Sequence, residues 1–161
     1  MTTYQMRYHP AAVTPGGRWL LTGLVCGALS VLIFHQGMFA LMNLFHFTQH
    51  PLYSTTATAP WGVPTIGSQV FWGAIWGVIF AAFFMGLWGG ALLVAGTLFG
   101  AFALSVVAWF VIAPIKGHGI AGGAVPMMMA AAFLANGAWG FGTALGLALF
   151  GRPKRDGWDA S

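Results

Sequence analysis

The chain has 161 residues and a mass of 17.0 kDa, a length typical of a single domain. Apolar residues make up 58% of it, charged residues make up 5%, and the mean hydropathy is +0.80. A soluble domain carries about 25% charged residues, whereas residues 19–115 and 117–151 contain no Asp, Glu, Lys or Arg. This composition excludes a soluble globular protein and predicts an integral membrane protein.

Four apolar stretches are long enough to cross a bilayer, which takes about 20 residues. They cover residues 19–45, 68–88, 90–113 and 126–150. We therefore predict an all-α integral membrane fold, a four-helix transmembrane bundle that forms one domain over residues 1–161. Loops at about 46–67 and 114–125 and tails at about 1–18 and 151–161 connect and flank these spans, with boundaries uncertain by about 2–4 residues.

The basic residues predict the orientation of this bundle. With four spans, both termini lie on one side, and that side holds all but one of the basic residues, namely Arg7, Arg18, Arg152, Lys154 and Arg155. The exception is Lys116, in the loop after the third span. Because cytoplasmic segments are enriched in Lys and Arg, we expect a bacterial inner-membrane protein with both termini in the cytoplasm and both long loops outside.

The residue inventory also removes several classes of site. The only carboxylates are Asp156 and Asp159 in the C-terminal tail, so the paired acids of glycosidases and the oxygen cages of calcium or magnesium are missing from the spans. Cys26 is the single cysteine, which excludes an internal disulfide and a thiolate zinc cluster. We expect no enzymatic activity. We also expect no nucleic-acid binding, since the basic residues fit membrane topology.

Glycines at four-residue spacing predict close helix packing. A G-x-x-x-G pair opens a groove in which two helix backbones can approach. The pairs are Gly23/Gly27, Gly73/Gly77, Gly86/Gly90, Gly96/Gly100 and Gly142/Gly146. They favour a tightly packed bundle, and the spacing does not distinguish contacts within one chain from contacts between chains.

Two short elements recur in the two halves of the chain. Val63-Pro64 precedes the second span and Val125-Pro126 the fourth, and Trp-Gly follows at 76–77 and again at 139–140. These repeats raise the hypothesis of two helical hairpins with the same orientation, which is a parallel internal repeat.

Polar residues inside spans are functional candidates, because an unpaired polar group in hydrocarbon costs free energy. The candidates are His35, Gln36, Asn43 and His46 on the first span and Asn136 on the fourth, where Asn136 could face His35 or Gln36. On a helix of 3.6 residues per turn, His35, Met38, Met42 and His46 fall within an arc of about 80°.

This histidine and methionine stripe has one structural interpretation and two functional ones. Packing with local hydrogen bonds is favoured, because methionine at helical spacing is usually core filler. Soft sulfur ligands suit copper, and Met38-x-x-x-Met42 resembles the paired methionines of the eukaryotic-type copper transporter family over those five residues alone. A proton or solute pathway is the other alternative. We predict no cofactor, with copper or a singly ligated tetrapyrrole as the alternatives.

The aromatic second span carries a wider resemblance. Trp61-Gly62-Val63-Pro64, followed by Phe71-Trp72-Gly73 and Trp76-Gly77, resembles small multi-span inner-membrane proteins of proteobacteria. That resemblance implies no particular activity.

Two functional hypotheses follow. The first is a non-catalytic accessory or structural subunit that packs in the lipid bilayer against other membrane subunits or against itself. The second is a small transporter or channel for a proton, a metal ion or a small neutral solute. The direction of the polar side chains separates them, because a hydrated interior favours transport and a lipid or partner surface favours a subunit.

Overall fold

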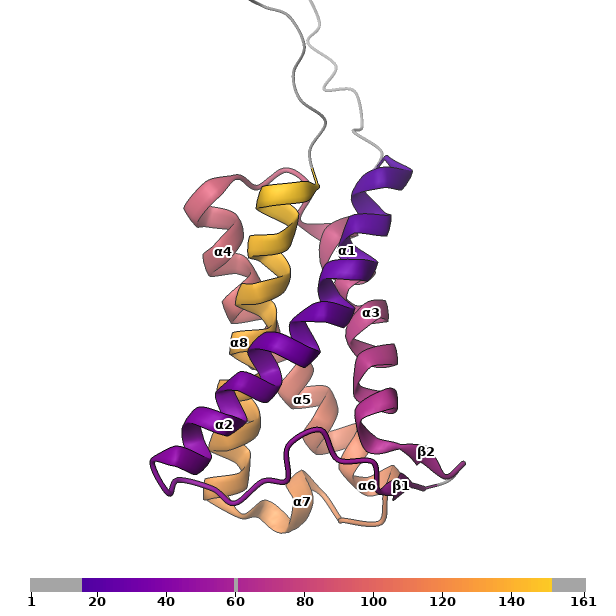
Figure 1. The fold of residues 1–161 in the computed structure, drawn as a ribbon, viewed down its shortest axis with the longest axis vertical. Coiled ribbons are helices and arrows are strands. Elements are labelled where there is room, and N and C mark those ends of the chain that lie inside the picture. Colours follow the sequence, from indigo (N-terminus) through magenta and orange to yellow (C-terminus); the bar gives the residue numbers. More distant parts are fainter. Residues whose placement is uncertain (1–15, 60, 152–161) are drawn as a thin grey trace, which may run out of the picture.

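The computed structural model describes residues 16–59 and 61–151, and Figure 1 shows their fold. Nearly all of the predicted tails, and with them most of the basic residues used for the orientation, lie outside these ranges. Within them, four helices are long and apolar enough to cross a membrane, at Gly17–Leu44, Thr65–Phe83, Gly89–Ile115 and Pro126–Phe150. The four-helix prediction is confirmed, and the span boundaries differ from those predicted by up to five residues.

Two of the spans contain π-helical turns. The first consists of α1 (Gly17–Ser30), η1 (Val31–His35) and α2 (Gln36–Leu44). The third consists of five consecutive elements, α4 (Gly89–Leu98), η2 (Phe99–Leu104), α5 (Ser105–Val107), η3 (Ala108–Ile112) and α6 (Ala113–Ile115).

The other two spans are regular helices that start at a proline. α3 (Thr65–Phe83) follows Pro64, and α8 (Pro126–Phe150) has Pro126 at its first position, where proline's fixed φ and missing N–H cost nothing. The short helix α7 (Ala121–Ala124) precedes α8. The strands β1 (Ala57–Thr58) and β2 (Val63–Pro64) form a small antiparallel hairpin that the sequence did not predict.

The bundle has two distinct ends. The first and last described residues, Gly16 and Gly151, lie at the same end, which we call the tail end (Figure 1). The two long connections, residues 45–64 and 116–125, lie at the opposite end, which we call the loop end. The first span crosses the bundle obliquely from the tail end to the loop end (Figure 1).

Glycines hold the first hairpin together. In α1, a Cβ added to Gly23 would meet the Gly77 carbonyl and the Ala81 side chain, and one added to Gly27 would meet the Gly73 carbonyl and the Gly77 Cα. Since backbone atoms have no room to move aside, α1 and α3 approach this closely only because side chains are absent.

The second hairpin repeats these contacts one for one. A Cβ on Gly96 of α4 would meet the Gly140 carbonyl and the Ala144 side chain, and one on Gly100 would meet the Asn136 carbonyl and the Gly140 Cα. The hairpins therefore correspond residue for residue at their crossing, with an offset of 73 in the first helix and 63 in the second. This agreement supports the parallel repeat, and Gly140 is a packing residue that the G-x-x-x-G search missed.

The remaining predicted pairs have different outcomes. Gly142 packs against Phe34 and Ser30, and Gly146 packs against Cys26, so both face the first span. The Gly86/Gly90 pair is wrong as a packing site. Both of these glycines are exposed with nothing near their Cβ positions, because they lie in and directly after the link between α3 and α4.

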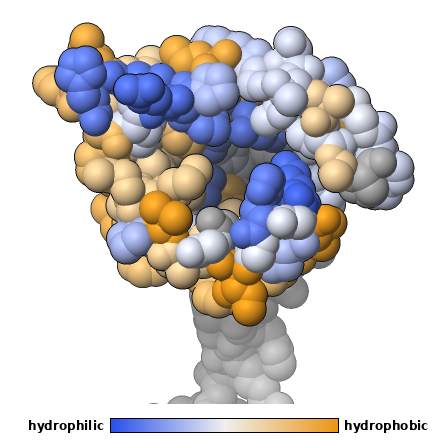
Figure 2. Space-filling model, turned by 90° about the horizontal axis from the view of Figure 1, so that it is seen from below, coloured by the Kyte–Doolittle hydropathy of each residue, from blue (hydrophilic) through white to orange (hydrophobic). Residues whose placement is uncertain are grey.

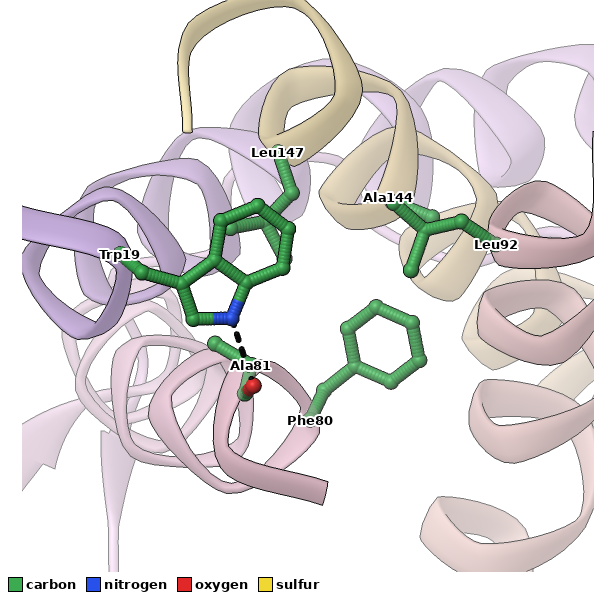
Figure 3. Packing of buried hydrophobic residues seen from close by; sticks show 6 residues of the cluster. All are labelled: Trp19, Phe80, Ala81, Leu92, Ala144 and Leu147. Carbon is green, nitrogen blue, oxygen red and sulfur yellow. Dashed lines mark hydrogen bonds between the residues drawn. The ribbon is translucent and has the colours of Figure 1, made fainter. Parts of the chain in front are cut away.

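A tight apolar core fills the tail end of the bundle. Its members come from all four spans and are Trp19, Phe80, Ala81, Leu92, Ala144 and Leu147 (Figure 3). The Trp19 indole nitrogen donates to the Ala81 carbonyl at 2.6 Å, which satisfies its one polar group inside the core (Figure 3). The tail half of the bundle is therefore closed by side chains.

The loop half is packed differently. The rings of Trp76 and Phe80 on α3, and of Phe84 directly after it, contact Phe99 at the start of η2, so the second and third spans meet towards the tail end. Along its whole length, α3 makes little backbone contact with α4, η2, α5, η3 or α6. Space is left between the two hairpins on the loop side of these rings.

Candidate functional site

A cavity of about 1070 Å³ occupies this space between the hairpins. We call it the central cavity. Its wall combines residues of η1 and α2, α3, the η2 to α6 stretch and α8, together with parts of the 50–63 loop. Seen from the loop end, the molecule is hollowed in the middle of this face, with hydrophilic residues beside the hollow (Figure 2). The cavity thus reaches from the loop end into the bundle and stops at the tail-end core.

The π-helical turns coincide with the wall of the cavity. His35 ends η1, Leu104 ends η2, and Ala108 and Ile112 bound η3, and all four residues line the cavity. A π-turn inserts an extra residue into the helical repeat and changes the direction of the side chains around it, which is why such turns occur often at functional sites. In the first and third spans, the irregular part therefore faces the hollow.

Two equivalent tryptophans form the floor of the cavity. Trp139 of the second hairpin donates its indole N–H to the Gly27 carbonyl of the first at 2.8 Å, and its own carbonyl accepts from Ser30 Oγ at 2.6 Å. Trp76 of the first hairpin packs against Phe99 of the second, with ring centroids 5.9 Å apart. Each tryptophan thus reaches across to the other hairpin, and the cavity lies at the interface between the two repeats.

Three of the polar side chains on this largely apolar wall come from three different spans, and they are His35, Gln69 and Asn136. Asn136 donates to Ser105 Oγ at 3.1 Å, and Gln69 Oε1 accepts from Gln36 Nε2 at 2.9 Å. Nδ1 of His35 is buried and has no hydrogen-bond partner among the described residues. The structure therefore brings His35 and Asn136 to one site, as the sequence suggested, although they are not bonded to each other.

Gln36 connects this wall to the loop that follows the first span. It is buried, and its Oε1 accepts from the backbone N–H of Tyr53 at 3.0 Å. The Tyr53 hydroxyl in turn donates to the Leu32 carbonyl at 2.8 Å. These bonds hold Tyr53 at a φ of 48°, a left-handed conformation that is costly for a bulky residue. Gln36 is thus a structural support of the site.

Asn43 performs a similar task at the end of the first span. Its Nδ2 donates to the His50 carbonyl at 2.7 Å, while its Oδ1 accepts from Thr48 Oγ1 at 2.8 Å and from the His50 N–H at 3.0 Å. The predicted polar residue therefore folds the loop back on α2, and it does not line the cavity.

That fold places His50 at the cavity wall. Its ring stacks on Phe39 with centroids 4.0 Å apart, and Phe39 also makes an edge contact with the His35 ring, with centroids 5.1 Å apart. Burial lowers the pKa of His50 below its ordinary value of 6.5, because the charged imidazolium loses hydration. The neutral ring is therefore the form that packs here.

The histidine and methionine stripe does not converge on one site. Met42 is buried against Phe39, Ala131 and Ala135, and Met38 lines a separate apolar groove of about 640 Å³ on another side of the bundle. His46 is exposed and has a φ of 57°, because the helix ends at Leu44, before the stripe is complete. Side chains within an arc of 80° can face different neighbouring parts of the bundle. Lying on one side of the helix therefore did not bring these four residues to one site.

This geometry does not add support for a metal site at the histidine and methionine stripe. Among the described residues there is no group of three or more His, Cys, Asp or Glu side chains that could hold a metal ion. The two histidines of the cavity wall both pack against Phe39. Copper and a singly ligated tetrapyrrole stay alternatives that the arrangement does not specifically favour.

Sequence reasoning missed Gln69, His50 and Ser105. Gln69 falls inside the predicted second span, so the rule that singled out Asn136 could have found it. Ser105 could have been found only with the knowledge that α5 faces Asn136. His50 lies in a loop, and only the bonds of Asn43 bring it to the wall.

Comparison of the chain with family models, with curated proteins and with solved structures found no match. The functional argument therefore rests on the site itself.

Proposed function

We propose that this protein is a small membrane transporter that binds a neutral solute in the central cavity. The observation that carries this proposal is the cavity wall, where His35, Gln69 and Asn136 turn toward an internal space of about 1070 Å³. Ligand sites are concave and mostly apolar, with a few converging polar groups, and this wall has that composition. The direction of the polar side chains favours transport over the subunit hypothesis.

The neutral character of the solute follows from the charges of the wall. The described part of the wall contains no carboxylate, and its only Lys or Arg is Lys116. A cation would have no counter-ion in a medium where unpaired charge is expensive. A metal ion would find too few ligands among these residues.

The position of the cavity also supports a transport role. Substrate sites of many transporters lie at the interface between two internal repeats, near the middle of the bilayer. Here Trp76 and Trp139 occupy equivalent positions on that interface, and the tail-end core closes the path beyond them. By the positive-inside rule the loop end faces the exterior of a bacterial inner membrane and both termini face the cytoplasm. The described state would then be open to the outside.

The test is solute entry into proteoliposomes that contain the full-length protein. The probes are radiolabelled glycerol, urea and nicotinamide, three neutral molecules of different shape. We expect at least one of them to enter faster than into protein-free liposomes, and His35→Ala to reduce its entry to the protein-free rate. Because His46 is exposed outside the cavity, His46→Ala is the matched control and should leave entry unchanged.

Folding of both variants is checked by their elution as a single species in detergent. Equal entry with and without protein for all three probes would contradict the proposal. Equal loss in His35→Ala and His46→Ala would remove the cavity from the mechanism.

A further inference from the structure

We infer that the solute of the central cavity is a planar ring that carries a carbonyl group. This inference rests on the proposed function only in using the same cavity. It is carried by two features of the wall, which are its aromatic surfaces and the kind of polar atom that it presents.

Aromatic rings make up much of the wall. Trp72 and Trp76 lie one turn apart on α3, so their side chains share a face. Phe71 makes an edge contact with Trp72, with ring centroids 5.5 Å apart. Trp139 and Phe39 face the same space from α8 and α2. Flat π-surfaces bind other flat π-surfaces through offset or edge contacts, which a saturated molecule of equal size cannot make.

Two amide side chains of the wall offer N–H donors that no described residue uses. The Gln69 oxygen already accepts from Gln36, and its amide nitrogen donates to no described residue. One N–H of Asn136 is used on Ser105, and an amide nitrogen carries two. The buried Nδ1 of His35 also lacks a protein partner within the described structure.

Such groups call for an acceptor on the ligand. Buried polar atoms are almost always hydrogen-bonded to something, and a ligand carbonyl oxygen can accept two of these donors. A ligand with a positive charge would meet donors and no described carboxylate. A neutral aromatic amide, lactam or quinone therefore fits the wall better than a polyol or an amine.

The experiment measures binding of radiolabelled benzamide to the full-length protein in lipid nanodiscs. Three unlabelled molecules compete with it. Nicotinamide has both the planar ring and the carbonyl, cyclohexanecarboxamide has the same amide on a non-planar ring, and benzyl alcohol has the ring without a carbonyl. We expect saturable benzamide binding that nicotinamide displaces, with the other two competing at least about tenfold more weakly, as expected when stacking or the hydrogen bonds are lost.

Variants assign the binding to the wall. His35→Phe and Asn136→Leu each replace a polar group by an apolar side chain of similar size, and we expect each to weaken benzamide binding by about three- to tenfold. Met38→Leu is the control, because Met38 lies on the same span and lines a different groove. It should leave binding unchanged. Because the competition series uses the unaltered protein, the inference stays testable even if a variant does not fold.

Non-saturable benzamide uptake, or equal competition by cyclohexanecarboxamide and nicotinamide, would overturn the inference. These outcomes are separable from those of the transport test. Entry of glycerol or urea without benzamide binding would leave transport intact and refute this ligand class. Saturable benzamide binding without entry of any probe would support this ligand class and refute transport.

Discussion

The interpretation of His35 from the sequence differs from the one that the structure favours. In the sequence it belongs with two methionines and His46, a combination that could hold copper. In the structure it ends a π-helical turn, lines the central cavity and meets the edge of Phe39. Its neighbours are then aromatic rings and amides, and these favour recognition of a neutral solute.

His50 predicts a pH response of the loop that follows the first span. Because burial lowers its pKa, the unfolded chain binds more protons than the folded one once the pH falls below 6.5, and the loop loses stability there. We expect faster amide exchange of residues 48–53 at pH 5 than at pH 7.5, after correction for the intrinsic pH dependence of exchange. Hydrogen exchange with mass spectrometry of the protein in nanodiscs measures this.

The control for that measurement is His50→Phe, which keeps a ring against Phe39 but cannot titrate. Its loop should exchange at the same corrected rate at both pH values. A pH response of equal size in the variant would assign the effect to another histidine, such as His35 on the same wall, and would contradict the role of His50.

At the scale of elements, glycine contacts fix each hairpin. Gly77 lies where α1 and α3 cross, and a Cβ there would meet the Gly23 carbonyl and the Gly27 Cα. We expect Gly77→Ala to lower the free energy of unfolding by about 1–3 kcal/mol, the usual cost of overpacking a close contact. Denaturation in mixed detergent and SDS micelles measures the change.

Gly37→Ala is the matched control for this substitution. Gly37 is also helical, but nothing lies within 4 Å of the position of its Cβ. Replacing a helical glycine that makes no close contact should leave the stability unchanged or raise it by about 0.5–1 kcal/mol. An equal loss in both variants would show that backbone effects, and not the helix crossing, determine the result.

The spans themselves were predictable because they depend on local composition. An uncharged run of about 20 residues is enough to indicate a membrane helix, and Pro64 and Pro126 mark the starts of α3 and α8. The π-helical turns were not predictable in this way. The arc assigned to the first span rests on a regular α-helix and so ignores the change of direction at its π-helical turn.

At the scale of the whole molecule, the subunit hypothesis stays a prediction. Large apolar side chains are exposed on all four spans, among them Leu21, Phe83, Val94 and Leu149. Lipid covers such a surface as well as a partner helix does, since lipid tails are as apolar as leucine. The surface alone therefore does not separate a subunit from an isolated transporter.

Native mass spectrometry of the protein released gently from its own membranes distinguishes a subunit from an isolated transporter. The subunit hypothesis expects a mass that includes another polypeptide or a second copy of this chain. A bare monomer would contradict it and leave the transport proposal in place. Additional mass equal to copper or to a tetrapyrrole would revive the cofactor alternatives.

The sequence by itself determined the membrane class, the four spans and most of the glycine contacts, because each depends on residues within one or two helical turns. The tertiary structure decided the site. The central cavity exists because α3 makes little backbone contact with the third span, and the apolar core fills only the tail end of the bundle. Which polar residues share it depends on helix crossings and on a loop tied by Asn43. Those are contacts between distant parts of the chain, and no local pattern encodes them.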